Sequence, residues 1–181
     1  LTHQFKGRRK GGFVMTYSML ASIVKYPFAS QLAGSHGKFG FFTLEKDSYQ
    51  KVADELGIFC KSKPGEPLRY ARHPLVYMVE AADDICYEIM DIEDSHKLKI
   101  LSYEETERLL LGFFDKETQN KIKERIKEEG VTDENEKVVY MRASAIGRLE
   151  NECVTAFLEH EKEILAGTFE GSLIDHIAEQ Q

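Results

Sequence analysis

The residues best suited to chemistry lie in an acidic stretch from Glu80 to Asp94, which holds seven carboxylates and no basic residue. In a helix that turns about 100° per residue, Asp83, Tyr87, Asp91 and Asp94 share one face. A solvated helix face usually pairs its acids with Lys or Arg four residues away, because like charges at that spacing repel. Uncompensated carboxylates beside small residues are typical of a hard-cation site or a clamp for sugar hydroxyls. The alternative is an ordinary polar stripe facing solvent.

A second feature is the acid-free N-terminal part of the chain. The first acidic residue is Glu45, whereas residues 1–44 hold six basic residues and carry +6 (Lys6, Arg8, Arg9, Lys10, Lys25 and Lys38). The other 137 residues hold 18 basic and 31 acidic side chains, so they carry −13 and the whole chain −7. A cationic segment on an acidic protein predicts an anionic ligand near that segment. For residues 6–10 a solvated basic loop explains the charge equally well.

The elements that must position these residues are helices. The spacing of apolar residues, capping residues, Gly and Pro predicts helices over residues 17–26, 45–56, 74–94, 102–111, 116–129 and 134–166, with a last short helix opened by Ser172. In the third of these helices, an apolar stripe falls opposite the acidic face (Met78, Ala82, Ile85, Ile89 and Ile92). No Asn-Gly or Asp-Gly turn joins two alternating runs, so no strands are expected. The predicted fold class is all-α.

Composition excludes several classes of protein. The 181 residues are 42% apolar and 30% charged, which is an ordinary balance for a folded domain. No apolar run approaches the roughly 20 residues of a bilayer span, so no membrane contact is expected. Three scattered cysteines do not form a disulfide framework, and a cytoplasmic location is the default. The chain opens on Leu1 without a signal peptide, as expected for a cut inside a longer protein.

Residues 72–94 resemble the signature helix of the deoxynucleoside triphosphate triphosphohydrolases, the dGTPase branch of the HD superfamily. The most specific piece is Glu80-Ala-Ala-Asp-Asp-Ile-Cys-Tyr87. Residues 15–27 and 38–42 are similar to the segments that precede this helix in the family, and residues 142–148 and 164–169 to its later helices. The resemblance covers nearly the whole chain in the same order.

This resemblance implies a reaction, a metal and a set of site residues. Such enzymes hydrolyse a dNTP to the deoxynucleoside and tripolyphosphate, by attack of water at the α-phosphorus, with a divalent cation such as Mg²⁺ or Mn²⁺. Asp83 matches the last metal-binding Asp of the family, and Tyr87 and Asp91 match positions that face the deoxyribose. Lys25, Tyr26 and Lys38 match positions that hold the triphosphate. The resemblance also implies dGTP as the favoured substrate, a homo-oligomer, and nucleic acid as a regulator.

One departure from the family concerns its other metal ligands, a His and a His-Asp dipeptide. No His-Asp dipeptide occurs in this sequence, and His36 and His73 lie in expected loops. The chain is therefore expected to be an HD-domain-like helical bundle that is N-terminally incomplete and inactive alone. Residues 1–112 would be the C-terminal part of the catalytic domain. Residues 113–181 would be a helical extension with an oligomer contact.

A hypothesis from a different class is a non-catalytic helical module that binds nucleotide or nucleic acid, or serves assembly. Its basic arm at residues 6–10 would contact phosphate. The acidic stretch from Glu80 to Asp94 discriminates between the two hypotheses, because a nucleic-acid surface would not place seven carboxylates close to its cationic arm.

Overall fold

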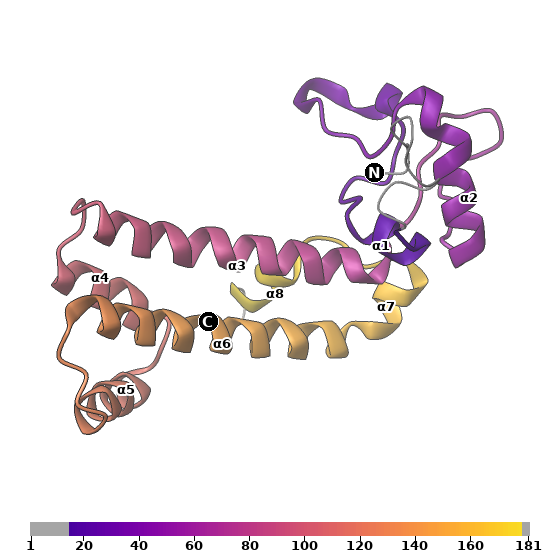
Figure 1. Cartoon of the computed structure of the whole chain (residues 1–181). Helices are drawn as coiled ribbons and strands as arrows, with labels where there is room; N and C mark the ends of the chain where they lie inside the picture. The colour runs from indigo at the N-terminus through magenta and orange to yellow at the C-terminus, as the bar shows by residue number, and fades with distance from the viewer. Residues whose placement is uncertain (1–14, 179–181) are drawn as a thin grey trace. The chain divides into compact units, whose positions relative to one another are not determined.

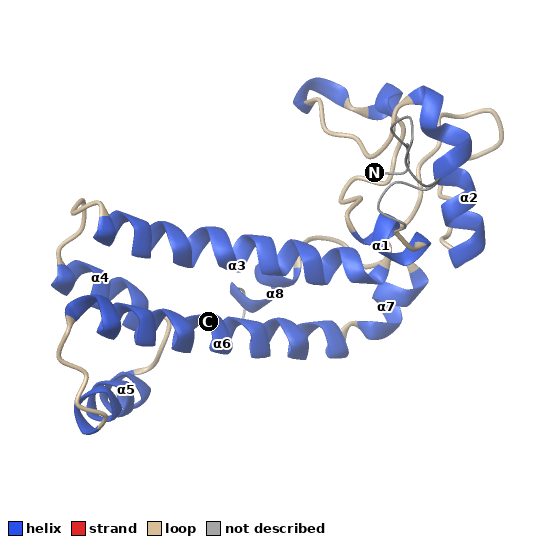
Figure 2. Ribbon diagram, viewed as in Figure 1, coloured by secondary structure: helices blue, strands red, loops and turns tan. Residues whose placement is uncertain are grey.

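The computed structural model describes residues 15–178, and within them the chain forms eight α-helices joined by loops (Figure 1; Figure 2). These are α1 (Tyr17–Ser22), α2 (Lys46–Leu56), α3 (Pro74–Lys97), α4 (Tyr103–Leu111), α5 (Lys116–Glu128), α6 (Glu134–Glu159), α7 (Glu161–Ala166) and α8 (Leu173–Ala178). Three short 3₁₀ turns, η1 (Ser30–Leu32), η2 (Gly34–His36) and η3 (Thr43–Glu45), lie between α1 and α2. Only three isolated bridges and no strand occur in the described range, which confirms the all-α prediction. The basic arm at residues 6–10 lies outside the described residues.

Most helix ends are set by local capping, as the sequence predicts. Ser102 and Glu105 form the reciprocal capping box that opens α4. The side chain of Asp115 accepts a hydrogen bond from the backbone N–H of Thr118 at 2.8 Å and opens α5. Gly57 follows α2 in the left-handed conformation (φ 65°), where a side chain would be strained.

Two helices differ from the prediction. Helix α1 ends at Ser22 rather than at Tyr26. Pro27 disfavours helical backbone at the residue before it, and the segment after Pro27 pairs with distant loops instead. The helix expected over residues 134–166 is two helices, because His160 leaves the helical conformation (φ −102°, ψ 13°) between α6 and α7. The His160 ring packs at 5.1 Å from that of Phe169 and 4.9 Å from that of His176, measured between centroids.

The chain divides into two compact units. The first contains the described residues up to Glu80 together with Phe157–His176, and the second contains Ala81–Ala156 with the described residues from Ile177 on. The boundaries of these units do not coincide with residue 112, where the sequence analysis places the boundary between a catalytic domain and a helical extension. The boundary at residue 112 concerns function rather than compactness, so it stays a prediction.

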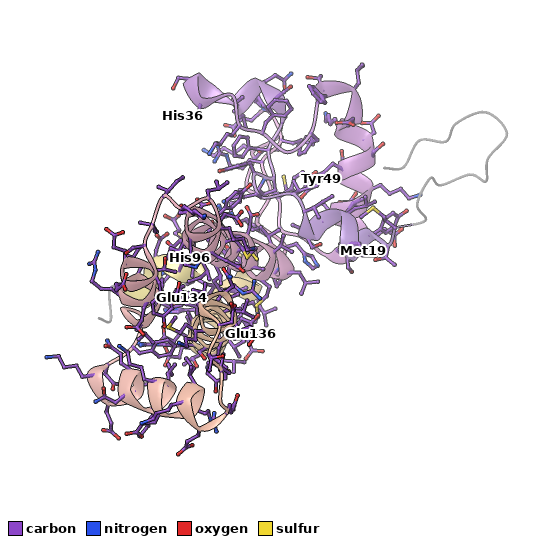
Figure 3. The ribbon with its side chains drawn as sticks, turned by 60° about the vertical axis from the view of Figure 1, so that its left-hand side comes forward. Met19, His36, Tyr49, His96, Glu134 and Glu136 are labelled. Atoms are coloured by element: carbon purple, nitrogen blue, oxygen red, sulfur yellow. The ribbon has the colours of Figure 1, made fainter. Side chains whose placement is uncertain are left out.

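The first unit has an aromatic core beneath its loops. Phe41 stacks on Tyr49 of α2 with 4.6 Å between ring centroids, and Tyr70 meets Tyr49 edge-on at 5.4 Å. Ala29 and Ala53 complete this buried cluster around Tyr49, which is labelled in Figure 3. Because the cluster joins three loop segments to α2, it fixes loops that would otherwise have little to hold them.

In the second unit, α3 and α6 run alongside each other (Figure 1). Their buried residues include Ile85 and Ile89 on α3 and Met141 and Ala145 on α6. Among residues 15–178, none of the helices combines the length and the apolar character that a bilayer crossing requires. All three cysteines are free, as their spacing predicts.

Candidate functional site

Four loop segments of the first unit lie side by side and build the scaffold of a site. Phe28 pairs with Arg69 in an antiparallel bridge, Ala29 pairs with Phe41 in a parallel bridge, and Cys60 pairs with Tyr70 in an antiparallel bridge. Backbone hydrogen bonds of 2.7–3.0 Å run from Tyr70 to Pro27, from Gly40 to Phe28 and from Lys61 to Arg69. The segments around residues 27, 40, 61 and 69 are therefore held together, although they are far apart in the sequence.

Gly40 permits the closest approach within this scaffold. A Cβ atom at this position would lie 2.3 Å from the carbonyl oxygen of Tyr26 and 2.5 Å from a methyl carbon of Val24. Only glycine therefore lets the two segments pack this tightly. Two residues before Gly40, the ammonium of Lys38 lies 5.4 Å from the centroid of the Tyr26 ring, within the range of a cation–π contact. The structure thus brings Lys38 and Tyr26 together.

A buried carboxylate, Glu80, holds the basic residues around this scaffold. Glu80 is 7% exposed, and its oxygens lie 3.0 Å from Lys25 Nζ and 3.0 Å from Arg72 Nη1. The Arg72 guanidinium also donates to the carbonyl oxygens of Lys25 and Gly171 at 3.1 Å. Arg72 therefore ties three separate segments together. Glu80 forms ion pairs with both Lys25 and Arg72.

The interpretation of the acidic stretch as wholly uncompensated is wrong for three of its members. Glu80 is paired as described, and Glu93 is paired with Arg142 Nη1 at 2.6 Å and Lys97 Nζ at 3.1 Å. The exposed Asp94 lies 3.6 Å from the same Lys97 Nζ. Lys25 and Arg142 come from distant parts of the sequence and Arg72 precedes the helix, so spacing along the helix could not reveal them. The carboxylates of Glu80 and Glu93 are both buried, and both are structural.

Next to Glu80 the first unit contains a cavity of about 250 Å³ with a cationic and aromatic lining. Its charged residues are Lys25, Lys61, Arg69, Arg72 and Glu170, and its aromatic residues include Tyr26, Phe28, Tyr77 and Phe169. The four cations are opposed by two carboxylates, Glu170 in the lining and the buried Glu80, which is paired with Lys25 and Arg72. The cavity therefore carries a net charge of +2. A cavity of this kind binds a compact anion.

Sequence reasoning identified Lys25 and Tyr26 of this cavity but missed Lys61, Arg69 and Arg72. A signal for them was present. Residues 61–72 hold four basic residues and one acid, a second cationic segment on an acidic chain. The Pro and Gly residues of positions 61–67 favour a loop, and that pattern obscures the cationic signal.

The predicted carboxylate face of α3 belongs to the second unit. Because α3 is unbroken from Pro74 to Lys97, Asp83, Tyr87 and Asp91 fall on one face at successive turns, and all three are exposed. In the opposite stripe, Ile85 and Ile89 are buried as predicted.

The rest of that stripe is less buried than predicted. Ala82 is exposed, and Met78 and Ile92 are half-buried. The buried face of α3 is instead completed by Ala81 and by the ion-paired carboxylate of Glu93.

The described residues do not by themselves fit a metal ion. Among residues 15–178, no three His, Cys, Asp or Glu side chains come together in a group that could hold one. Asp83 therefore stands without companion ligands within the described range, whereas a divalent cation in a protein site takes several oxygen ligands. His36, in η2, is exposed (Figure 3) and belongs to no such group.

The six predicted site residues thus form two sets. Lys25, Tyr26 and Lys38 meet at the loop scaffold of the first unit. Asp83, Tyr87 and Asp91 share the exposed face of α3 in the second unit. The first set can bind phosphate, and the second offers hydrogen-bond acceptors and an aromatic ring to a polar ligand.

Comparison with known proteins gives a consistent set of relatives. The chain is 35% identical over 180 residues to a deoxyguanosinetriphosphate triphosphohydrolase-like protein of Pseudomonas aeruginosa, covering 97% of this chain and 38% of that protein. It is 36% identical over 176 residues to a protein of the same description from Synechocystis, covering 92% and 38%. A deoxyguanosinetriphosphate triphosphohydrolase of Yersinia pestis is 26% identical over 179 residues, covering 89% and 34%. The chain therefore spans little more than a third of the length of these relatives. No family model matches it.

Proposed function

We propose that this chain, which over the length that it matches belongs to the family of the deoxyguanosinetriphosphate triphosphohydrolase-like proteins, has a role in nucleotide binding. It would supply the triphosphate and sugar contacts of a dNTP triphosphohydrolase. The whole protein would hydrolyse dGTP, or another dNTP, to the deoxynucleoside and tripolyphosphate. In this proposal the first unit binds the triphosphate and the exposed face of α3 binds the deoxyribose.

The observation that carries the proposal is the cationic cavity beside Glu80. A triphosphate is a compact, highly charged anion, and it needs several cations at fixed positions. Lys25 and Tyr26 line the cavity, and Lys38 lies over the ring of Tyr26. The ion pair with Glu80 and the close packing at Gly40 hold these groups in place without ligand. A preorganised site of this kind loses less conformational freedom when the phosphate binds.

The sugar contacts are proposed for Tyr87 and Asp91, which lie one helical turn apart on α3. A carboxylate accepts a hydrogen bond from the 3′-hydroxyl, while an aromatic ring against the 2′ carbon leaves no room for a second hydroxyl. The pair would therefore select deoxyribose over ribose. Tyr87 is 65% exposed, so its ring is free to meet a ligand.

Asp83 is proposed as one ligand of a divalent cation, Mg²⁺ or Mn²⁺, the remaining ligands of which lie outside the described residues. Bound there, the cation would supply charge stabilisation at the phosphate. The described residues contribute one carboxylate to it, and their own roles are to bind and orient the nucleotide.

The test is the rate of tripolyphosphate release from dGTP and from GTP by the full-length protein, with Mg²⁺ or Mn²⁺ present. We expect Asp91→Ala to lower the rate on dGTP by about tenfold or more, since a hydrogen bond to a charged group contributes roughly 1.5–3 kcal/mol. Tyr87→Ala should reduce the preference for dGTP over GTP, because the ring no longer blocks the 2′ position. Asp83→Asn should abolish turnover. Glu88→Gln is the control, because Glu88 is an exposed acid of the same helix with no proposed contact.

An unchanged rate on dGTP in Asp91→Ala would refute the contact to the 3′-hydroxyl, and an unchanged preference for dGTP in Tyr87→Ala would refute the role of the ring. Full activity in Asp83→Asn would refute the metal contact. Binding of dGTP without any turnover would favour a non-catalytic nucleotide-binding module. The basic arm of that second hypothesis lies outside the described residues, so no structural observation favours it.

A further inference from the structure

We infer that Lys61 and Arg69 form a second cationic wall of the anion cavity and bind the polyphosphate together with Lys25. This inference rests on the proposed function and extends it to two residues that neither the family resemblance nor the comparisons single out. It concerns only the first unit, whose loops carry all three residues.

Backbone pairing places Lys61 and Arg69 opposite each other. Cys60 and Tyr70 form an antiparallel bridge, and the backbone N–H of Lys61 donates to the carbonyl of Arg69 at 2.7 Å. Side chains of residues that face each other across such a pair lie on the same side, and those of the next residues lie on the other side. Tyr70 is buried in the aromatic core, so Lys61 and Arg69 project away from that core and line the cavity.

Two like charges directly opposite each other across a bridge repel, so a folded protein needs a reason to keep them. Neither Lys61 nor Arg69 forms an ion pair with a carboxylate of the described residues. Lys25 and Arg72, in the same cavity, share Glu80. The uncompensated charge of the cavity is therefore concentrated on the wall that Lys61 and Arg69 form.

Arg69 is also held in position for binding. Its guanidinium carbon lies 4.8 Å from the centroid of the Phe28 ring, and its backbone N–H donates to Ser62 Oγ at 2.7 Å. A stacked guanidinium keeps its N–H groups directed outward in the plane of the fork, which is the geometry that meets two phosphate oxygens. A polyphosphate long enough to contact Lys25 and the wall of Lys61 and Arg69 at once would gain binding free energy from both. Orthophosphate would contact either Lys25 or the wall, but not both.

The experiment measures binding of inorganic tripolyphosphate and of orthophosphate to the full-length protein by calorimetry at constant ionic strength. The variants are Lys61→Ala, Arg69→Ala and Arg69→Lys, and Lys25→Ala tests the proposed function separately. Lys63→Ala is the matched control, because Lys63 is an exposed lysine of the same loop that does not line the cavity. Circular dichroism establishes that each variant is folded, and Arg69→Lys keeps the charge if Arg69→Ala does not fold.

We expect tripolyphosphate binding to weaken about tenfold in Lys61→Ala and more than tenfold in Arg69→Ala, since each charge-assisted contact contributes roughly 1.4 kcal/mol or more. Arg69→Lys should fall between Arg69→Ala and the wild type, and Lys63→Ala should equal the wild type. Orthophosphate binding should change less than tripolyphosphate binding. Wild-type affinity in both Lys61→Ala and Arg69→Ala, with weak binding in Lys25→Ala, would overturn this inference and leave the proposed function standing. Wild-type affinity in Lys25→Ala as well would overturn both.

Discussion

The buried carboxylate of Glu93 offers the sharpest test of the energetics of the second unit. Glu93 is 2% exposed, and its two oxygens accept hydrogen bonds from Arg142 on α6 and Lys97 on α3. The substitution Glu93→Gln keeps the size and shape of the side chain and removes its charge. Arg142 then remains next to a neutral amide that satisfies one of its N–H groups at most.

The expected cost follows from these contacts. A hydrogen bond to a charged group contributes roughly 1.5–3 kcal/mol, and breaking a buried ion pair by changing one partner costs about 3–5 kcal/mol. Lys97 is half exposed and can regain water, so the loss is dominated by Arg142. We expect Glu93→Gln to lower the free energy of unfolding by about 2–4 kcal/mol at pH 7.

The pH dependence of this loss separates the ion pair from a packing defect. Burial by itself raises the pKa of Glu93, but hydrogen bonds from Arg142 and Lys97 lower it by more, so the pKa in the folded protein lies below the ordinary 4.5. The unfolded chain therefore takes up a proton at higher pH than the folded protein does. The stabilisation is fully present above pH 4.5 and is lost as the pH falls through the folded-state pKa.

The assay is urea denaturation of the wild type and Glu93→Gln between pH 7 and the acid limit of folding, followed by circular dichroism. The difference between the two proteins should shrink below pH 4.5. Glu88→Gln, an exposed acid on the same helix, is the control and should stay within about 0.5 kcal/mol of the wild type. A loss below about 0.5 kcal/mol in Glu93→Gln, or a loss that does not change with pH, would refute the reasoning.

Three further substitutions are tested by urea denaturation. Gly40→Ala places a methyl group 2.3 Å from the Tyr26 carbonyl oxygen and should destabilise the protein by about 1–3 kcal/mol and weaken tripolyphosphate binding. Gly147→Ala, in the middle of α6 with open space around its Cβ, should instead stabilise it by about 0.5–1 kcal/mol, and equal effects at the two glycines would contradict the packing argument. Tyr49→Phe should stabilise the protein by about 1 kcal/mol, because the buried hydroxyl of Tyr49 has no hydrogen-bond partner among the described residues; a clear loss of stability would show that it has one.

Features that depend on near neighbours in the sequence were predictable. Ser102 with Glu105, Asp115 and Gly57 each signal a helix end through a contact within three or four residues, and each lies where the sequence places it. The shared face of Asp83 and Asp91 follows from helical spacing alone. Such predictions succeed because capping and periodicity are local properties of the chain.

Features that depend on distant partners were not predictable in this way. The charge of Glu80 is compensated by Arg72 and Lys25, the second of which lies 55 positions earlier, and Glu93 meets Arg142, 49 positions later. The break at His160 has one local contact, 2.8 Å between His160 Nδ1 and Glu163 Oε2, but the rings that pack against His160 belong to Phe169 and His176. Only the assembled fold brings these groups together.

The distribution of charge favours a compact polyanion over a nucleic acid as the ligand of the cavity. Residues 45–181 carry −13, and residues 61–72 within them carry +3, so the remainder carries −16. Binding along a nucleic-acid backbone needs cations spread over many phosphates, because each neutralised phosphate contributes separately. Here four cations of the first unit, Lys25, Lys61, Arg69 and Arg72, line one cavity of about 250 Å³. Such a cavity admits a few phosphate groups at once, and the acidic remainder of the chain would repel a longer strand. The same charge balance that makes the protein acidic therefore favours a short, concentrated anion, such as the triphosphate of the proposed function, over a longer strand.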